Sequence, residues 1–346
     1  MMFVFPKDIA LFQGALMNFT KRNNGYFEYS SIDISSPEKN VINLNGVEYV
    51  FTYLSDEVNG GSGGNSVIMR LFTIEDLYDD DDELDYQEPI SVIKICKVPI
   101  KRKKLKKIHE RFDMEVQSLK ECLDAKFQNI VKIIENGVCK IFNPISDKYE
   151  EYPFYTMEYA QYSLKSFIES KHDDLGIDEK IGLCLSLCEG LNELESLGFY
   201  HRDIKPENIF MTESGSWKIG DLGLIDDRKK IVTLDRKNEA IGPRGWMTPE
   251  SMNKYLCENK EFYFKHDCVI DHQSDIFQLG KVFWYIFQHN APIGTVKESD
   301  FLLKNSSLFS VCKTMLNYSK KKRFKHVMEI IKLLKPIELK LLKSAS

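Results

Sequence analysis

The pattern of apolar and polar positions divides the chain into a strand-rich first part and a helix-rich second part. Short apolar runs bounded by turn residues are typical of strands. The first part contains such runs at residues 46–54, 66–74, 90–98, 130–142 and 152–160. A glycine cluster separates the first two runs, so we predict that they form a hairpin.

Helical periodicity appears once among these runs and then dominates the rest of the chain. The segment RFDMEVQSLKECL predicts a helix with one buried stripe, formed by Phe112, Val116, Leu119 and Leu123. Later runs repeat the period near 3.6 residues, at residues 180–199, 274–288 and 323–334. We therefore expect an α+β protein with two lobes and a cleft between them.

Charged segments interrupt this pattern. The acidic block EDLYDDDDELDYQE, residues 75–88, is too dense in like charge to pack, so we predict a solvated loop. The basic segment KRKKLKKIHER, residues 101–111, either neutralises that loop or solvates the start of a helix. Residues 1 to about 45 show polar, turn-like stretches without recognisable chemistry. We treat them as an extension of unknown role.

Composition narrows the class of protein. A chain of 346 residues with 43% hydrophobic content can bury a large core. The net charge of -5 argues against nucleic acid as the main partner, because phosphate backbones attract basic surfaces. The eight cysteines form no C-x-x-C pair, which favours reduced core thiols and an intracellular, cytoplasmic location. We see no secretory signal and no run approaching the roughly 18 apolar residues of a membrane span.

The segment YHRDIKPENIF, residues 200–210, carries the strongest chemical signal. It matches the pattern H-R-D-x-x-x-x-N and resembles the catalytic loop of eukaryotic-type serine/threonine protein kinases. Phosphoryl transfer needs a hydroxyl aimed in line at the γ-phosphate of ATP, and a carboxylate can orient that hydroxyl and accept its proton. The resemblance implies that Asp203 is this base and that Asn208 holds Mg²⁺.

A second motif of the same family follows. The segment KIGDLGL resembles the metal-binding Asp-Phe-Gly, with Leu222 in place of phenylalanine. Mg²⁺ requires hard oxygen ligands. The resemblance implies that Asp221 is a Mg²⁺ ligand together with Asn208. We expect the apolar Leu222 to change the local packing and to leave the metal site intact.

A lysine of the third strand-like run completes the implied phosphate contacts. Lys94 in SVIKICK resembles the lysine that contacts the α- and β-phosphates and pairs with a glutamate of the following helix. Glu115, 21 residues later, is the candidate partner. Lys97 competes for the lysine role, and strand alternation places it on the opposite face. The family spacing favours Lys94.

The resemblance also implies a nucleotide-binding flap and a hinge. The loop NGGSGGNS, Asn59 to Ser66, occupies the place of the glycine-rich flap, in which Gly61 and Gly63 let backbone N–H groups approach the phosphates. Ser66 stands where the family has its third glycine. At the hinge, the resemblance implies that Met157 is the gatekeeper and that the backbone of Glu158 and Ala160 faces adenine.

Landmarks later in the chain follow the family's order. Thr248-Pro249-Glu250 resembles Ala-Pro-Glu, and Arg323 resembles the arginine that pairs with Glu250. Asp275 resembles the buried aspartate that anchors the catalytic loop. His201 is expected to support that loop. Arg202 is a candidate to bind a phosphate on the activation segment, with hydroxyl candidates at Thr233 and Thr248.

The acceptor class rests on one lysine. Lys205, two residues after Asp203, resembles the lysine typical of serine/threonine kinases, and its ammonium can neutralise the transferred phosphate. Pro243 stands where the family usually has a threonine that bonds to this lysine and aspartate. We therefore expect unusual peptide positioning near the acceptor site.

The resemblance runs from about Gly46 to Leu334 and implies a bilobal kinase fold that uses ATP and Mg²⁺ on a protein substrate with a serine or threonine acceptor. We expect a small antiparallel sheet with one main helix at about 46–157, a hinge at about 158–161 and a mostly helical lobe at about 162–346. The sequence leaves the oligomeric state open. Two alternatives stay open as well: a pseudokinase that binds ATP without turnover, and a small-molecule phosphotransferase.

Overall fold

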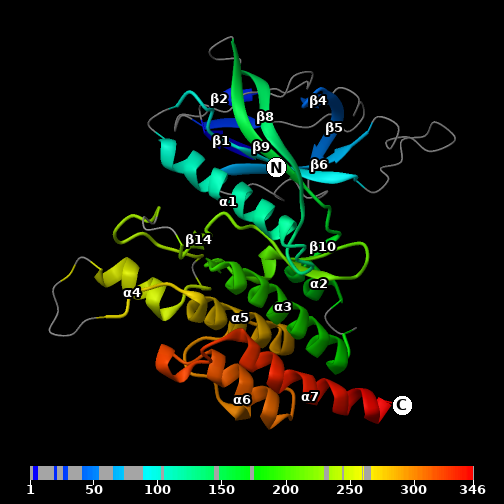
Figure 1. Cartoon of the computed structure of the whole chain (residues 1–346), viewed down its shortest axis with the longest axis vertical. Helices are drawn as coiled ribbons and strands as arrows, with labels where there is room; N and C mark the ends of the chain where they lie inside the picture. Colours follow the sequence, from blue (N-terminus) through cyan, green and yellow to red (C-terminus); the bar gives the residue numbers. More distant parts are fainter. Residues whose placement is uncertain are drawn as a thin grey trace. The chain divides into compact units, whose positions relative to one another are not determined.

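The computed structural model describes the chain except residues 1–2, 7–18, 22–25, 30–40, 54–64, 74–88, 103–104, 144–147, 172–174, 230–233, 244, 259, 261–265 and 346. The chain forms two compact units, and the division passes through helix α1, Lys106–Asp124 (Figure 1). The first unit comprises residues 1–116 and 132–159. The second comprises residues 117–131 and 160–346. The α+β, bilobal fold expected from the sequence is thereby confirmed.

The first unit is built on a six-stranded antiparallel sheet with the order β4-β5-β6-β7-β9-β8. The predicted hairpin is confirmed, because β5 and β6 pair with Val50 opposite Phe72. The sheet's apolar core includes Phe51, Ile93 and Phe154. The strands are β4 Val41–Leu44, β5 Val47–Tyr53, β6 Ser66–Phe72, β7 Ser91–Cys96, β8 Ile133–Asn143 and β9 Lys148–Met157.

The sheet begins earlier in the chain than the predicted start at Gly46. Strand β4 precedes Gly46, with Ile42 and Leu44 buried. Asn45 and Gly46 both have positive φ, 50° and 94°, as a two-residue hairpin turn requires. An Asn-Gly pair beside the alternating VINL was a signal that could have revealed this strand. Residues expected as an extension also form a three-stranded sheet, β1 Phe3–Pro6, β2 Phe19–Lys21 and β3 Tyr26–Tyr29, in the order β1-β3-β2.

Helix α1, Lys106–Asp124, confirms the first predicted helix but corrects its buried face. Leu123 was predicted to be buried and is 42% exposed. The buried line runs instead along Phe112, Glu115, Leu119 and Cys122. Steps of three and four residues allow either line. The polar residue Glu115 belongs to the buried line, which a count of apolar residues alone cannot reveal.

The second unit is mainly helical. The predicted helices at 180–199, 274–288 and 323–334 are confirmed as α3, α5 and α7, although α7 starts four residues later than predicted. Between α5 and α6 the described residues form a 3₁₀ turn at Glu298–Asp300 and no α-helix. The helices are α2 Leu164–Lys171, α3 Ile177–Leu197, α4 Pro249–Cys257, α5 His272–Gln288, α6 Ser306–Met315 and α7 Val327–Ala345.

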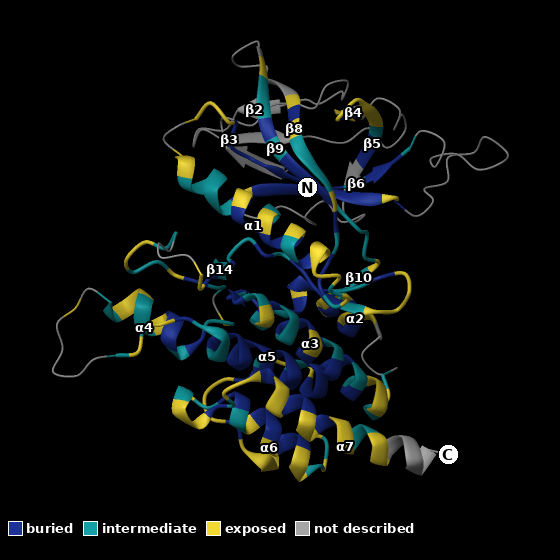
Figure 2. Ribbon diagram, viewed as in Figure 1, coloured by how far each residue is buried: buried dark blue, intermediate teal, exposed yellow. Residues whose placement is uncertain are grey.

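Helix α5 lies in the core of the second unit and is buried along most of its length (Figure 2). Gly280 lets it approach the end of α6, since a Cβ there would lie 2.7 Å from the Met315 side chain. Short strands beside this core hold the connecting loops in place, with β10 pairing β12, β12 pairing β13 and β11 pairing β14. They are β10 Tyr162–Ser163, β11 Phe199–Tyr200, β12 Ile209–Met211, β13 Trp217–Ile219 and β14 Asp226–Asp227.

All eight cysteines are free thiols. Six are buried, as predicted for core thiols, whereas Cys257 and Cys268 are partly exposed. Burial raises the pKa of the Cys96 thiol to about 11, so this thiol is held in its neutral form. Within the described part of the chain, no helix combines the length and the apolar character needed to cross a bilayer.

Candidate active site

The loop between β11 and β12 is held by helix α5. The carboxylate of Asp275 accepts the backbone N–H groups of His201 at 2.8 Å and Arg202 at 2.7 Å. One turn later, Gln278 donates to the carbonyl of Arg202 and accepts from the N–H of Ile204, both at 3.1 Å. Arg202 has a φ of 67°, a conformation that needs such support in a non-glycine residue. Burial raises the pKa of Asp275 to about 7, and the two backbone bonds act against that rise.

His201 packs beneath the loop in its neutral form. Its ring nitrogen Nδ1 accepts the N–H of Asp203 at 3.2 Å. The proton is therefore on Nε2, which donates to the carbonyl of Gly220 at 3.1 Å. Burial lowers the pKa of His201 to about 4. These contacts fit the supporting role expected for His201.

Two other predicted site residues, Lys205 and Asn208, contact the carboxylate of Asp203. Its Oδ2 accepts a hydrogen bond from the ammonium of Lys205 and another from the amide nitrogen of Asn208, each at 2.9 Å. The same amide nitrogen also donates to the Asp203 carbonyl at 2.9 Å. Asp203 is only 6% exposed, and its Oδ1 is a buried atom without a hydrogen-bond partner among the described residues. Burial raises the pKa of Asp203 to about 6, while Lys205 acts to lower it.

Asp221 completes the cluster in the second unit. It follows β13 with a φ of 56°, and its charge contributes to the raised pKa of Asp203, after burial as the main cause. The preceding Gly220 donates its N–H to the carbonyl of Asn208 at 2.9 Å, which ties the two segments together. A side chain at Gly220 would lie 2.8 Å from Val131, so the close approach needs glycine. Leu222, which replaces the family's phenylalanine, is fully buried.

The donor set of this cluster fits Mg²⁺. The amide nitrogen of Asn208 faces Asp203, so the oxygen of the same amide offers the lone pairs for a cation. Asp221 adds a carboxylate, and both are hard oxygen donors of the kind that Mg²⁺ prefers.

Lys94 and Glu115 form a buried ion pair in the first unit. The ammonium of Lys94 lies 2.7 Å from Glu115 Oε1, with side-chain exposures of 7% and 2%. The Tyr155 hydroxyl donates to the same oxygen at 2.9 Å. Tyr155 stands opposite Lys94 in the β7–β9 pairing, so strand register placed it there and no local motif marked it. Of the two candidate lysines, Lys94 is the one that pairs with Glu115. Lys97 lies just past β7, and burial lowers its pKa to about 8.

The remaining nucleotide contacts predicted from the sequence stay predictions. Gly61 and Gly63 lie outside the described residues. Glu158 donates its backbone N–H to the carbonyl of Lys132 at 3.0 Å, and its carboxylate accepts the N–H of Lys132 at 2.7 Å. Ala160 is half-buried.

Arg202 has carboxylate partners where the sequence suggested a phosphate. Its guanidinium lies 2.7 Å from Asp235 and 3.4 Å from Asp226. Thr233 lies outside the described residues. Thr248 is 1% exposed and caps α4 by accepting the N–H of Ser251 at 3.1 Å. Its hydroxyl is therefore a structural group, which corrects its place among the candidate phosphorylation sites.

The predicted pair of Glu250 and Arg323 is present and fully bonded. Two parallel bonds, of 2.7 and 3.2 Å, join the carboxylate to the guanidinium. The other three N–H groups of Arg323 donate to the backbone carbonyls of Asn317, Gln273 and Tyr318. A guanidinium has five N–H donors, so every donor of Arg323 is used.

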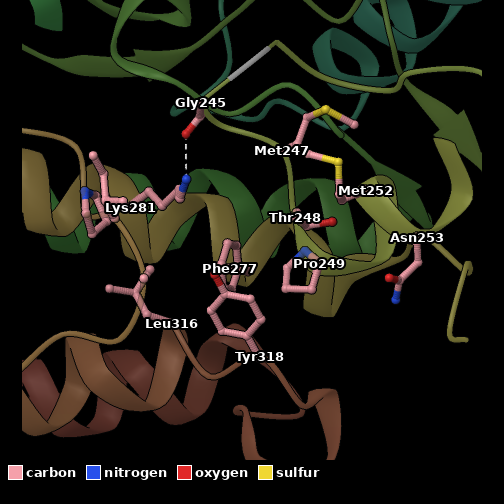
Figure 3. Close-up of a pocket in the computed structure, with 13 residues that line it drawn as sticks. Gly245, Met247, Thr248, Pro249, Met252, Asn253, Phe277, Lys281, Leu316 and Tyr318 are labelled. Carbon is pink, nitrogen blue, oxygen red and sulfur yellow. Dashed lines mark hydrogen bonds between the residues drawn. The ribbon is translucent and has the colours of Figure 1, made fainter. Parts of the chain in front are cut away.

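The second unit has a pocket of about 490 Å³, lined in part by Thr248 and Pro249, which precede Glu250 in the chain. Figure 3 shows residues that line it. Its wall is largely apolar and holds one ammonium, that of Lys281, which donates to the carbonyl of Gly245 at 2.5 Å. Asp203, Asn208 and Asp221 do not line it. The lining residues include Met247, Thr248, Pro249, Met252, Phe277, Leu316 and Tyr318.

Comparison with known proteins gives a family match over most of the chain. The family described as protein tyrosine and serine/threonine kinase matches residues 83–331. Serine/threonine-protein kinase 10 of Xenopus tropicalis is 32% identical over 122 residues, which cover 35% of this chain and 12% of that protein. Serine/threonine-protein kinase 16 of Homo sapiens is 26% identical over 129 residues, 37% of this chain and 41% of that protein.

A relative with a receptor name matches to a similar degree. Macrophage colony-stimulating factor 1 receptor 1 of Takifugu rubripes is 33% identical over 124 residues, 36% of this chain and 11% of that protein. In each of these three matches, the chain spans less than half of the relative's length.

Proposed function

Because the chain belongs to the protein tyrosine and serine/threonine kinase family, we propose that it transfers the γ-phosphate of ATP to a serine or threonine hydroxyl of a protein. One observation carries the proposal: the carboxylate of Asp203 is buried and keeps one oxygen without a partner among the described residues, while its other oxygen is fixed by Lys205 and Asn208. A buried, unsatisfied carboxylate oxygen is costly unless a ligand uses it.

Asp203 acts as the base in this proposal. Oδ1 accepts the hydrogen bond of the substrate hydroxyl and then its proton as the oxygen attacks phosphorus. The two bonds to Oδ2 prevent the carboxylate from rotating, so Oδ1 is presented in one direction. A proton acceptor needs a pKa below the working pH, and the pKa of about 6, raised by burial, meets that condition at neutral pH.

Lys205 supports the serine/threonine assignment. Its ammonium lies 2.9 Å from Asp203 Oδ2, and its side chain is 20% exposed. In this position it offsets negative charge beside the acceptor hydroxyl. The resemblance of HRDIKPEN to the serine/threonine pattern and the names of the two serine/threonine relatives point to the same acceptor class.

Asn208 and Asp221 are the proposed Mg²⁺ ligands. When bound, the ion offsets the charge of the phosphate oxygens during transfer. Asn208 presents its amide oxygen because its amide nitrogen is held by Asp203. Asp221 is oriented by the turn after Gly220, whose N–H is bonded to Asn208.

Lys94 is the proposed contact to the α- and β-phosphates, and Glu115 positions it. The pair is buried, so the ammonium is held in one place.

In the same proposal, Gly61 and Gly63 offer backbone N–H groups to the phosphates, and the backbone of Glu158 and Ala160 contacts adenine. The sequence places the kinase domain at residues 46–346, with lobes at about 46–157 and 162–346 joined by a hinge at about 158–161. Because β4 pairs with β5 in the same sheet, we propose that the domain begins at Val41. The eight free thiols support a reducing, cytoplasmic setting.

Transfer of label from γ-labelled ATP in the presence of Mg²⁺ tests the proposal. The acceptors are peptides that differ only in a serine, threonine or tyrosine, together with small aliphatic alcohols. We expect Mg²⁺-dependent labelling of the serine and threonine peptides. Labelling of tyrosine alone would overturn the acceptor class, and labelling of small alcohols alone would support the small-molecule phosphotransferase. Nucleotide binding without any transfer would support the pseudokinase.

Two lysine variants provide a matched control. Lys94 and Lys97 are both buried, at 5% and 6% exposure, and lie three residues apart. We expect Lys94→Met to lower the transfer rate by roughly 10²-fold, as the loss of one electrostatic contact to the reacting group does. Lys97→Met should stay close to the wild-type rate. Equal losses in the two variants would contradict the role assigned to Lys94.

A further inference from the structure

Three potential metal ligands meet in the second unit, apart from the residues assigned to phosphate transfer. Glu195, His272 and His326 each present a ligand atom, and these atoms lie within 4.8 Å of one another. Glu195 lies near the end of α3, His272 is the first residue of α5, and His326 directly precedes α7. Three separate segments therefore converge on one point.

The contacts within this cluster are close. Nδ1 of His326 lies 2.6 Å from Glu195 Oε1. The rings of His272 and His326 stack at a centroid distance of 5.6 Å with an interplanar angle of 10°. Nε2 of His272 lies 2.6 Å from the carbonyl oxygen of Lys325. A backbone carbonyl bonded to one ring nitrogen fixes the tautomer and orientation of an imidazole, as commonly seen for metal-binding histidines.

Supporting bonds hold the segments of His272 and His326 in place, and Glu195 lies within helix α3. Gln273 donates to the carbonyls of Lys320 and Phe324, which fastens the segment before His326 to the start of α5. The backbone N–H of His326 donates to the carboxylate of Glu329 at 3.1 Å. The three ligands thus sit on backbone that other contacts already fix, and binding an ion needs only side-chain movement.

We propose that Glu195, His272 and His326 bind a Zn²⁺ ion, with water as the remaining ligand. Two imidazole nitrogens and one carboxylate oxygen suit Zn²⁺, whereas Mg²⁺ and Ca²⁺ prefer oxygen ligands alone. Tetrahedral Zn²⁺ with bonds near 2.0–2.1 Å places its ligands about 3.3 Å apart. Separations of up to 4.8 Å reach that value by small rotations of the side chains.

The ion has room for a water ligand and a defined effect on the fold. The side chain of His326 is 64% exposed and that of Glu195 is 16% exposed, so one side of the site faces solvent. A bound ion would join the start of α7 to α3 and α5, the helices of the second unit that carry Glu195 and His272. Zn²⁺ should therefore stabilise the folded chain, because it binds the folded arrangement and not the unfolded chain.

Zn²⁺ titration of the metal-free full chain against a chromophoric chelator tests the proposal. We expect one ion per chain and a rise in melting temperature on adding Zn²⁺. His326→Gln and Glu195→Gln should each weaken binding at least tenfold and abolish most of the thermal shift. Both positions are partly exposed, and the melting curve without Zn²⁺ checks that each variant folds.

The matched control for the Zn²⁺ titration lies at the other end of α5 from His272. His289 is an exposed residue that ends α5 with a φ of 58° and is not among the three converging ligands. His289→Asn removes an imidazole and keeps a residue type that tolerates this backbone. It should bind Zn²⁺ as the wild type does.

The absorption spectrum of the Co²⁺-loaded chain separates this site from the cysteines. Nitrogen and oxygen ligands give visible bands without the near-ultraviolet band of a thiolate ligand. A thiolate band would place the ion at a cysteine such as Cys257 or Cys268 and overturn the proposal. The absence of Zn²⁺ binding, or equal binding by wild type and His326→Gln, would overturn it too.

Discussion

Two charged clusters of the second unit are buried to a similar degree but differ in how their hydrogen-bonding groups are used. Every N–H of Arg323 has an acceptor, and its ion pair with Glu250 is bidentate. Within the part of the chain that the structure describes, Asp203 has two donors on Oδ2 and none on Oδ1. A cluster that serves only the fold can be completed by the chain itself. The Asp203 cluster leaves one oxygen open, as its proposed role toward a substrate hydroxyl requires.

The two clusters should therefore respond to mutation in opposite ways. Changing Arg323 leaves a buried carboxylate without its partner, which costs folding free energy. Changing Asp203 to asparagine removes a buried charge whose Oδ1 has no partner among the described residues and whose cationic partner, Lys205, is partly exposed, so folding should lose little while transfer is lost.

The largest expected effect is on catalysis. Asp203→Asn keeps the size of the side chain and removes the proton acceptor, so we expect the transfer rate to fall by roughly 10²–10⁴-fold. The urea midpoint should stay at or above that of the wild type, because the variant has no buried charge at this position. Single-turnover transfer and urea denaturation measure the two outcomes. A variant that loses stability and rate together would erase the contrast with the Arg323 cluster.

The next effect is on stability. Arg323→Met strands the Glu250 carboxylate at 2% exposure and should lower the free energy of unfolding by about 3–5 kcal/mol. Urea denaturation followed by far-ultraviolet circular dichroism measures it. The double variant Arg323→Met with Glu250→Leu removes both charges and should recover part of the loss. A double variant as unstable as the single one would show that packing, and not charge, dominates at this site.

A smaller effect is expected from pH. Burial raises the pKa of Asp203 to about 6, and the base is the deprotonated form, so kcat/KM should be flat above pH 7 and fall below pH 6. At pH 5 we expect about one tenth of the plateau value. Unfolding measured at each pH is the control. A profile that stays flat to pH 5 would contradict the base assignment, as would a fall that merely tracks unfolding.

The smallest effect concerns the cap of α4 beside Glu250. Thr248→Ala removes the acceptor of the Ser251 N–H and should cost about 1 kcal/mol of stability. Thr248→Ser keeps the hydroxyl and should recover most of it. Thermal melting of the two variants compares them directly. Equal stability of the alanine variant and the wild type would show that the Thr248 cap does not stabilise the fold.

The sequence was sufficient where a motif fixes both residue and spacing. Asp203, Lys205 and Asn208 lie within six residues, so their meeting follows from a single loop. Glu115 could be paired with Lys94 because the family resemblance implies a glutamate on the helix that follows the strand of the lysine.

The sequence was insufficient where the partner is chosen by tertiary packing. Tyr155 reaches Glu115 through strand register, and Gln278 reaches the catalytic loop from one turn beyond Asp275. Leu123 was misplaced because two helical faces fit the same apolar spacing. Arg202 was expected to bind a phosphate on the activation segment, whereas its guanidinium lies 2.7 Å from the Asp235 carboxylate. That aspartate belongs to no motif, so sequence spacing could not assign it.

Helix α5 holds no reacting group, yet Asp275 and Gln278 on it fix the backbone on either side of Arg202. The geometry of the loop therefore depends on the apolar packing around α5, including the close approach at Gly280. A methyl group added at Gly280 would clash with Met315, and we expect the resulting displacement of α5 to move the loop that Asp275 and Gln278 hold. The rate of the proposed phosphate transfer should then respond to changes in interior packing that are too small to change the melting temperature.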